Sequence, residues 1–227
     1  MKLYGCGNHG FSYTEKYKKS IVTIFDWVND QESQELDYQK FQEKVSSLGV
    51  SKQSEVRMII PFLVKAGVIN ESNVIRGKSR IRAIRIDNNF FTENGKIFVQ
   101  VLKIILLALK TEDTTILRQV LATYHKIGRI QFGELRNSEE AIYQDLYDFL
   151  KEYKHINRDE FFLLTSCRAW DKMGDLPKYI TQYREGKIKD IEYASNVNCY
   201  QYIIATLEDL GVLIKTNDGY VLSTSIE

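Results

Sequence analysis

The chain has 227 residues, of which 44% are apolar and 27% are charged, an ordinary balance for a folded globular protein. Three scattered cysteines argue against a disulfide framework and for a reducing compartment. No charged-then-apolar leader is evident, and the apolar stretch 97–109 is interrupted by polar residues and too short for a membrane span. We therefore expect a cytoplasmic protein with no membrane partner.

The net charge of +1 does not by itself indicate a nucleic-acid binder. The charges are unevenly distributed, however. Residues 1–100 contain 15 Lys and Arg against 11 Asp and Glu, whereas the other 127 residues contain 16 against 19. The first part is therefore the better candidate to face phosphate.

The first predicted module covers residues 1–96. Helical spacing over residues 38–48 ends at Gly49, and a second helix is expected from an N-cap at Ser51 to about Ala66. Pro61 lies inside this helix and should kink it. Gly67 ends it, and residues 68–70 and 81–86 predict two strands around a loop. This order of elements is typical of a winged helix-turn-helix module.

Residues 97–114 predict a connecting helix, and residues 115–227 predict a second, helical winged-helix module. Within it, helical faces are expected over residues 115–124 and 139–153. Ser195 is expected to cap a last helix that ends at Gly211, before a hairpin around the turn Asn-Asp-Gly at 217–219.

The segments LVKAGVI and LEDLGVLI occupy the same place in both modules, at a helix end, a glycine and a strand. This repetition indicates duplication. We therefore expect a mainly α fold with small β-hairpin wings (α+β), in which a helix joins two winged helix-turn-helix modules.

The first predicted wing carries a run of basic residues with no acid among them: Arg76, Lys78, Arg80, Arg82 and Arg85. Clusters of this kind neutralise phosphates, because each contact releases condensed counterions. Strand alternation places Arg80 and Arg82 opposite Ile81. A solvated hairpin whose arginines pair with acids elsewhere is the alternative.

The second helix of the first module has a polar face opposite its buried stripe, with Lys52, Gln53, Ser54, Arg57 and Lys65. Gln can form two hydrogen bonds to adenine and Arg two to guanine, so this face is a candidate for base recognition. An ordinary solvated helix face is the alternative.

The last predicted helix presents Asn196, Asn198 and Gln201, of which the latter two are three residues apart and share a face. Their amides favour adenine. For Asn196 the alternative is a simple helix cap, a position that Asn prefers.

The sequence contains no convincing catalytic constellation. Cys6 and His9 have the spacing of metal ligands, but two further ligands are not in sight. A metal-dependent nuclease needs a carboxylate followed by an acid-x-Lys triplet on a strand. The triplet at 152–154 lies in a predicted helix, and Asp175 with residues 185–187 lacks an apolar strand. We expect no catalytic residue and no cofactor in this chain, with magnesium required only if a nuclease domain or partner is present.

Three segments together resemble the DNA-recognition region of FokI-type (type IIS) restriction endonucleases. They are KLYGCGNHGFSYTEKYKKSIVTIFD, IDNNFFTENGK and REGKIKDIEYASNVNCYQYIIATLEDLGVLI. The resemblance covers most of the chain but is dispersed. It implies tandem winged-helix subdomains in a family that cuts DNA at a distance with a separate nuclease domain, which this sequence lacks. Asn198 and Gln201 stand where the family pattern has basic base-reading residues, so the target should differ.

The resemblance implies sequence-specific double-stranded DNA binding, as the recognition domain or specificity subunit of a restriction endonuclease with a separate nuclease part. It also implies that the N-terminal arm touches bases, so we expect Asn8 and His9 to lie in a groove, between glycines that let the backbone approach DNA. A disordered tail is the alternative for this arm. For the whole chain, the alternatives are a winged-helix transcription regulator or plasmid replication initiator, and a winged-helix scaffold that binds only protein.

Overall fold

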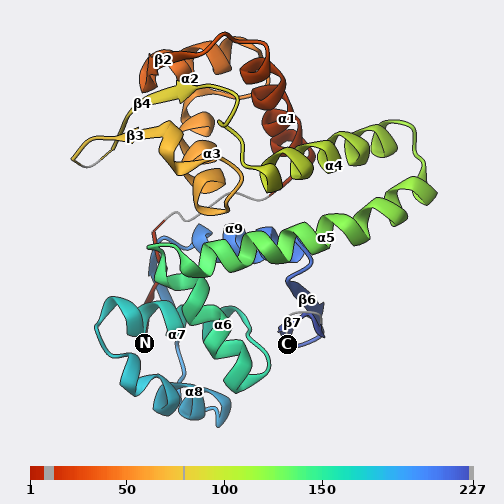
Figure 1. The fold of residues 1–227 in the computed structure, drawn as a ribbon. Coiled ribbons are helices and arrows are strands. Elements are labelled where there is room, and N and C mark those ends of the chain that lie inside the picture. Colours follow the sequence, from red (N-terminus) through yellow and green to blue (C-terminus); the bar gives the residue numbers. More distant parts are fainter. Residues whose placement is uncertain (8–12, 79, 225–227) are drawn as a thin grey trace. The chain divides into compact units, whose positions relative to one another are not determined.

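The computed structural model of the chain describes residues 1–7, 13–78 and 80–224 (Figure 1). Helices hold 61% of the described residues and the strands form small sheets, so the fold is mainly α with a minor β content, as the sequence predicted. The chain forms two compact units. Residues 13–134 form the central unit, and the described parts of 1–12 and 135–227 form the terminal unit.

The central unit contains four helices and most of a fifth, together with a three-stranded sheet. In chain order its elements are α1 (Glu15–Asn29), β2 (Gln34–Asp37), α2 (Tyr38–Ser47), α3 (Gln53–Lys65), β3 (Val74–Arg76), β4 (Ile81–Ile86), α4 (Glu93–Lys110) and most of α5 (Thr114–Asn137).

The helices α4 and α5 belong to the central unit and do not form a free connector. Helix α4 packs along α1, and Phe98 of α4 stacks on Tyr124 of α5 with ring centroids 5.9 Å apart. Tyr13 meets the same Phe98 ring edge-on at 5.8 Å. These aromatic contacts bind α5 to the core of the central unit. The compact units therefore meet at residues 12/13 and 134/135, and not at the expected boundaries of 1–96, 97–114 and 115–227.

The turn between α2 and α3 differs from expectation at one residue. Ser51 was expected to cap α3, but its side chain is buried and its hydroxyl donates to the Ser20 hydroxyl of α1 at 2.6 Å. At the start of α3 the Glu55 carboxylate instead accepts from the backbone N–H of Lys52 at 2.9 Å. Despite Pro61, α3 continues to Lys65, and residues 62 and 63 beyond the proline are buried in the core.

The sheet of the central unit has the order β2-β4-β3, with antiparallel pairs on both sides of β4. The strand expected at 68–70 is wrong, since Ile69 makes only an isolated bridge to Phe91. The side chain of Asn70 then accepts from the N–H of Ser72 at 3.2 Å and begins a 3-10 turn, so the hairpin strand starts only at Val74. The strand β2 was not expected from the sequence.

The terminal unit is built around α7, whose apolar run is almost wholly buried. Its elements are β1 (Lys2–Tyr4), α6 (Ala141–Tyr153), α7 (Arg158–Ala169), α8 (Leu176–Arg184), β5 (Glu192–Ser195), α9 (Asn198–Asp209), β6 (Leu213–Thr216) and β7 (Gly219–Leu222). The strands β1 and β5 pair in parallel. The backbone N–H of Tyr4 donates to Ser166 at 2.7 Å, and the Thr165 hydroxyl donates to the Tyr4 carbonyl at 2.7 Å, so β1 is fixed to α7.

Helices α3 and α9 end in the same six-residue turn. The N–H of Val68 donates to the carbonyl of Leu63 at 2.8 Å, and the N–H of Val212 donates to that of Leu207 at 2.9 Å. The glycine inside each turn, Gly67 or Gly211, has a φ of 66° or 69°. This left-handed C-cap is the reason for the glycine in both sequence segments.

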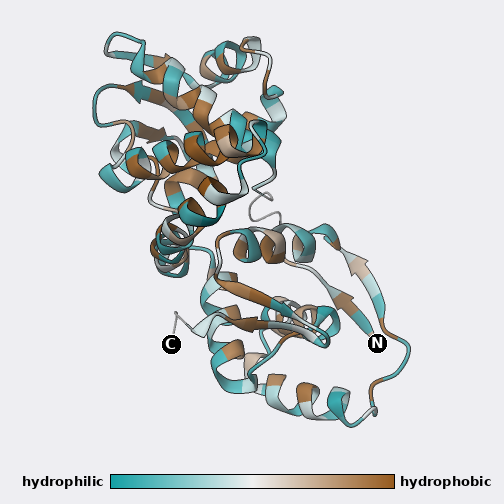
Figure 2. Cartoon of the chain, turned by 90° about the vertical axis from the view of Figure 1, so that its right-hand side faces the viewer, coloured by the Kyte–Doolittle hydropathy of each residue, from teal (hydrophilic) through white to brown (hydrophobic). Residues whose placement is uncertain are grey.

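The core of each unit consists mainly of buried apolar residues, although α4 and α5 also expose several, including Ile97, Leu107 and Ile130. Figure 2 colours the chain by the hydropathy of each residue. No helix within the described residues combines the length and apolar character that a membrane crossing requires.

Candidate nucleic-acid interface

A hollow of about 620 Å³ lies in the central unit, where α2, α3 and the β3–β4 hairpin meet. We call it the basic hollow. Its lining residues are Asp37, Tyr38, Gln39, Gln42, Gln53, Arg57, Pro61, Lys65, Arg76, Arg80, Ile81 and Arg82. Three elements that are separate in sequence thus contribute to one concave surface.

Five cationic side chains and one carboxylate line the basic hollow. The carboxylate of Asp37 accepts from the N–H of Gln39 at 2.8 Å, at the start of α2. Arg76 lies 3.7 Å from Glu71 in an exposed ion pair. Among the described residues, Arg57, Arg80 and Arg82 form no ion pair, and all three are exposed. The hollow therefore presents positive charge that the described chain does not neutralise.

The structure brings together most of the site residues predicted for the first module. Gln53 and Arg57 of α3 line the basic hollow together with Arg76, Arg80 and Arg82 of the hairpin. Lys52, Ser54 and Lys78 are also exposed but do not line it. Arg85, on the same strand as Arg82, lies outside the hollow and pairs with Glu35 at 3.9 Å.

Sequence reasoning missed the contribution of α2 to the basic hollow. The helical spacing over residues 38–48 begins at Tyr38, whose ring stacks on Phe41 with centroids 6.4 Å apart. Its hydroxyl oxygen is buried, however, with the side chain of Gln42 as its neighbour. Burial raises the pKa of Tyr38, although the nearby Gln42 amide and the charge of Arg57 oppose that rise.

The residues predicted for the second module lie at the start of α9. Asn196, Asn198 and Gln201 are exposed. Asn196 has a φ of 52° and its backbone carbonyl accepts from the N–H of Cys199 at 3.0 Å. Ser195, expected to cap this helix, instead belongs to β5, and α9 begins at Asn198. The expected cap is wrong because the parallel pairing with β1 holds Ser195 in a strand.

Two predicted site residues, Asn8 and His9, lie outside the described residues. Cys6, considered with His9 as a metal ligand, has the thiol of Cys199 as its neighbour. Hydrogen bonding to Cys199 and burial raise the pKa of Cys6. In the part of the chain that the structure describes, no group of three or more His, Cys, Asp or Glu side chains is arranged to hold a metal ion.

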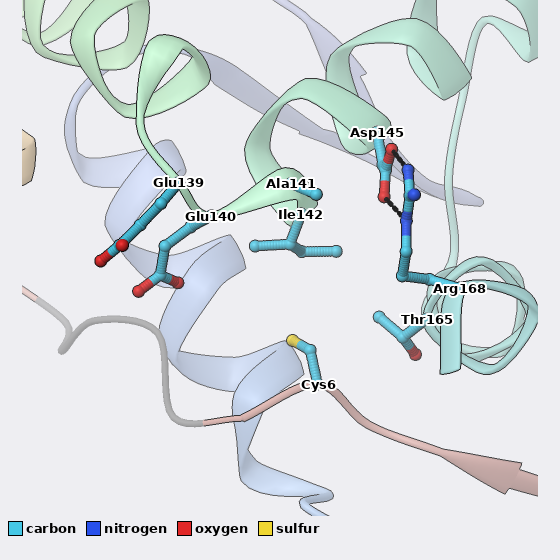
Figure 3. A pocket seen from close by; sticks show the side chains of 8 residues that line it. All are labelled: Cys6, Glu139, Glu140, Ala141, Ile142, Asp145, Thr165 and Arg168. Atoms are coloured by element: carbon cyan, nitrogen blue, oxygen red, sulfur yellow. Dashed lines mark hydrogen bonds and ion pairs between the residues drawn. The ribbon is translucent and has the colours of Figure 1, made fainter. Parts of the chain in front are cut away.

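A second hollow, of about 380 Å³, lies in the terminal unit and has the opposite character (Figure 3). Glu139, Glu140 and Asp145 line it, with Arg168 as its cation. Arg168 is bound to the Asp145 carboxylate through both Nε, at 2.7 Å, and a terminal nitrogen, and this pairing raises the pKa of Arg168. With its cation paired, this acidic hollow does not suit phosphate.

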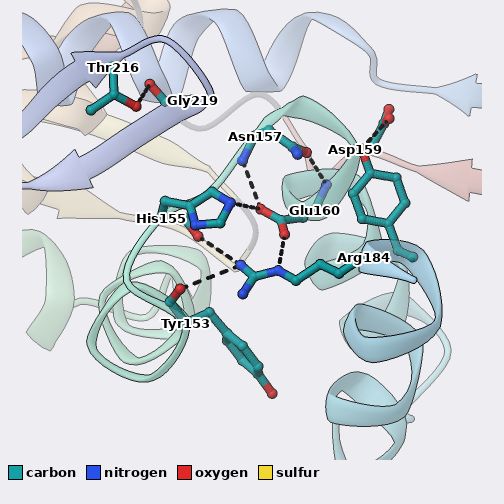
Figure 4. Close-up of polar contacts among 9 residues, drawn as sticks. Tyr153, His155, Asn157, Asp159, Glu160, Arg184, Thr216 and Gly219 are labelled. Carbon is teal, nitrogen blue, oxygen red and sulfur yellow. Dashed lines mark hydrogen bonds and ion pairs between the residues drawn. The ribbon is translucent and has the colours of Figure 1, made fainter. Parts of the chain in front are cut away.

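A buried polar network supports the start of α7 (Figure 4). The carboxylate of Glu160 is fully buried, accepts from the backbone N–H of Asn157 at 3.0 Å and from Arg184 Nε at 2.7 Å, and lies 3.7 Å from His155. Asn157 in turn accepts from the N–H of Glu160 at 3.0 Å. This reciprocal cap, with its partly buried cation, has a structural role.

The residues weighed for a nuclease triplet are not arranged on a strand. Asp175 ends a 3-10 turn, and Glu185 directly follows α8. Lys187 pairs with Glu185 at 2.6 Å. The other triplet, residues 152–154, lies at the end of α6.

No family model matches the chain, and neither a curated protein nor a solved structure is detectably similar to it. The resemblance to the recognition region of FokI-type endonucleases therefore stays a prediction, and function has to be inferred from the residues themselves.

Proposed function

We propose that the chain binds double-stranded DNA in a sequence-specific manner through the basic hollow. In this proposal α2, α3 and the β3–β4 hairpin act as a winged helix-turn-helix module, with α3 as the recognition helix and the hairpin as the wing. The observation that carries the proposal is the basic hollow itself, in which Arg57, Arg80 and Arg82 are exposed and form no ion pair with the described residues.

Charge of this kind fits a polyanion. Neutralising each phosphate with an arginine releases condensed counterions, which is the main source of affinity for DNA of any sequence. The chain as a whole is almost neutral, so the attraction is confined to this surface and does not come from net charge.

Recognition of a DNA sequence requires hydrogen-bond donors and acceptors that reach the edges of the bases. Lys52, Gln53 and Ser54 are exposed at the start of α3, the part of a recognition helix that contacts bases in helix-turn-helix proteins. The amide of Gln53 matches the N6 and N7 edge of adenine. We assign the same role to Asn198 and Gln201, exposed at the start of α9, so that two modules divide the reading of the site.

A binding selection from random duplex DNA with the full chain tests this proposal. We expect enrichment of a defined sequence that contains adenine, together with weaker binding to unrelated duplexes that decreases steeply with salt. Failure to enrich any sequence while salt-sensitive binding persists would contradict sequence specificity, and absence of any duplex binding would contradict the proposal entirely.

We propose further that this recognition serves a type IIS restriction endonuclease. The support is the sequence resemblance alone. The selected sequence tests it through gene context, because a neighbouring DNA methyltransferase acting on that sequence is expected for restriction. Occurrence of the sequence as repeats at a plasmid origin would instead favour a replication initiator.

A further inference from the structure

Cys6 and Cys199 bring two thiols together in the terminal unit, although they come from opposite ends of the chain. Cys6 follows β1, and Cys199 lies in the first turn of α9. The parallel pairing of β1 with β5 holds these segments together, and the backbone N–H of Gly5 extends it by donating to the Ser195 carbonyl at 2.9 Å. The thiol of Cys6 is hydrogen-bonded to that of Cys199, so the two sulfur atoms are neighbours before any bond forms between them.

Gly5 permits this close approach. A Cβ added at Gly5 would lie 2.7 Å from Cys199 Sγ and 2.3 Å from the carbonyl oxygen of Asn196. A side chain at this position would therefore push the end of β1 away from the start of α9. Because Gly5 has none, the chain can bring the sulfur of the next residue, Cys6, to Cys199.

The two thiols differ in acidity. The hydrogen bond from Cys6 lowers the pKa of Cys199, and backbone N–H groups, including that of Tyr200, act in the same direction, although burial opposes them. A thiol in the first turn of a helix commonly becomes more acidic in this way. Cys199 is thus the thiol prepared to attack an oxidised Cys6.

Cys6 is the accessible member of the pair. It is partly exposed and lines the acidic hollow, whereas Cys199 is completely buried (Figure 3). A hollow of about 380 Å³ admits a molecule as small as hydrogen peroxide. An oxidant that enters it therefore meets the sulfur of Cys6 first.

We propose that Cys6 and Cys199 form a redox-sensitive pair, which a hydroperoxide converts to a disulfide. The Cys6 sulfur attacks the terminal peroxide oxygen, the O–O bond breaks, and the thiol proton leaves with the released oxygen as water or an alcohol. The Cys199 sulfur then attacks the sulfenic acid of Cys6, the S–O bond breaks, and hydroxide leaves with the remaining proton as water. Two thiols are oxidised and one peroxide is reduced, and exchange with a small thiol reverses the reaction.

The disulfide has a consequence for the start of α9. An S–S bond of about 2.05 Å is shorter than the contact between two hydrogen-bonded thiols, so its formation must shift the first turn of α9 relative to Gly5. Asn198, to which we assign base reading, directly precedes Cys199. This consequence rests on the proposed DNA binding. Oxidation should impair recognition of the selected sequence, whereas the basic hollow lies in the central unit and should keep its affinity for any duplex.

The experiment treats the reduced full chain with hydrogen peroxide and maps its disulfides by mass spectrometry under non-reducing conditions. We expect the loss of two thiols, a peptide pair that joins Cys6 to Cys199, and recovery of both thiols with dithiothreitol. Cys6→Ser should form no disulfide, and Cys199→Ala should stop at a sulfenic acid on Cys6, which dimedone traps. Cys167→Ala is the matched control and should form the disulfide as wild type does, because Cys167 is buried in α7 and burial raises its pKa to about 11.

Fluorescence-anisotropy titrations of the reduced and oxidised chain measure the consequence for DNA. Oxidation should reduce the preference for the selected duplex over its single-base variants about tenfold, which corresponds to the loss of one bidentate base contact. Binding to an unrelated duplex should change little. The same treatment should leave the preference of Cys6→Ser unchanged.

The outcomes separate the redox pair from the proposed function. Thiols of Cys6 and Cys199 that stay reduced under peroxide, or a disulfide that contains Cys167, would overturn the pair. A Cys6–Cys199 disulfide that leaves base preference unchanged would overturn its effect on recognition. Absence of duplex binding by the reduced wild-type chain would instead overturn the proposed function, and the disulfide map would still decide whether the pair exists.

Discussion

The α3–β3–β4 region and the α9–β6–β7 region share the same backbone conformation at the helix end but differ in the side chains that they expose. Each helix ends in a left-handed glycine, with the following valine N–H bonded back to a leucine carbonyl. The first region then continues through a 3-10 turn into a hairpin with exposed arginines. The second continues directly into the β6–β7 hairpin. The turn of this hairpin carries the acidic residue Asp218, which directly precedes β7.

The two hairpins also differ in how they are held. Tyr220 of β7 forms an antiparallel bridge with Ile156, and a Cβ added at Gly219 would come within 2.3 Å of the Ile156 carbonyl oxygen. The second hairpin is therefore packed closely on its own unit, whereas the first one borders a hollow. Similar local sequence thus determines the helix end, and the surrounding side chains determine what each region can bind.

The largest expected effect is loss of DNA affinity in the double variant Arg80→Ala and Arg82→Ala. Binding to all duplexes should weaken by at least about 2 kcal/mol, and the salt slope should decrease by about one unit for each lost phosphate contact. Titrations of specific and unrelated duplexes measure both quantities.

Two controls make this test specific to the basic hollow. Arg85→Ala removes a cation from the same strand that is paired with Glu35, and Lys215→Ala removes one from the second hairpin. Both should have little effect. Equal losses in all three proteins would mean that affinity follows total charge and not the hollow.

A smaller and more selective effect is expected from Gln201→Ala in α9. Loss of a bidentate amide contact should remove discrimination of about 1.5 kcal/mol at one or two positions, while binding to unrelated duplexes stays nearly unchanged. Single-base variants of the selected site measure this. A specificity profile identical to that of wild type would show that the second region does not read sequence.

The sequence predicted the elements with strong periodicity and clear stops. The helices ending near Gly49, Gly67 and Gly211 and the hairpin around residues 217–219 are confirmed. The predictions that failed are the helix caps at Ser51 and Ser195, where tertiary contacts determine the conformation. Ser51 has the residue type of a cap, but its hydroxyl bonds to α1, and Ser195 is held in a strand by a partner almost two hundred residues away.

The candidate site could be predicted only in part, for a related reason. Arg57 and Arg82 could be assigned to exposed faces because helical and strand periodicity determine which side they occupy. Tyr38 could not, since the helical spacing over residues 38–48 does not determine where its hydroxyl lies. That position depends on how α2 lies against α3 and the hairpin, which no local pattern contains.

The two helix ends offer a direct test of their equivalence. Replacing either glycine with alanine forces an L-residue into the left-handed region, which should cost about 1 kcal/mol in each case. We expect both Gly67→Ala and Gly211→Ala to lower the free energy of unfolding, measured by urea denaturation. The loss should be the larger for Gly67→Ala, because its added Cβ would lie 2.9 Å from Cγ of Glu134, which must shift. Gly133→Ala is the control, because its added Cβ meets no atom within 4 Å and its position in α5 favours alanine. A negligible change in the free energy of unfolding at only one of the two capping glycines would show that the two helix ends are not equivalent.

The smallest expected effect concerns the starts of the two helices and depends on pH. Burial raises the pKa of Glu55, but hydrogen bonds from Lys16 and from the Lys52 backbone prevail and lower it. Because the folded-state pKa lies below the ordinary value of 4.5, ionised Glu55 stabilises the fold above that pH, and this contribution is lost as the pH falls through the folded-state value. Glu55→Gln should therefore lower the melting temperature at pH 7 by no more than about 4 °C, and the difference from wild type should be smaller at pH 3. The first turn of α9 contains no acid, so Gln201→Ala should show the same offset from wild type at both pH values. A Glu55→Gln difference that is undiminished at pH 3 would contradict the contribution of the Glu55 charge to stability.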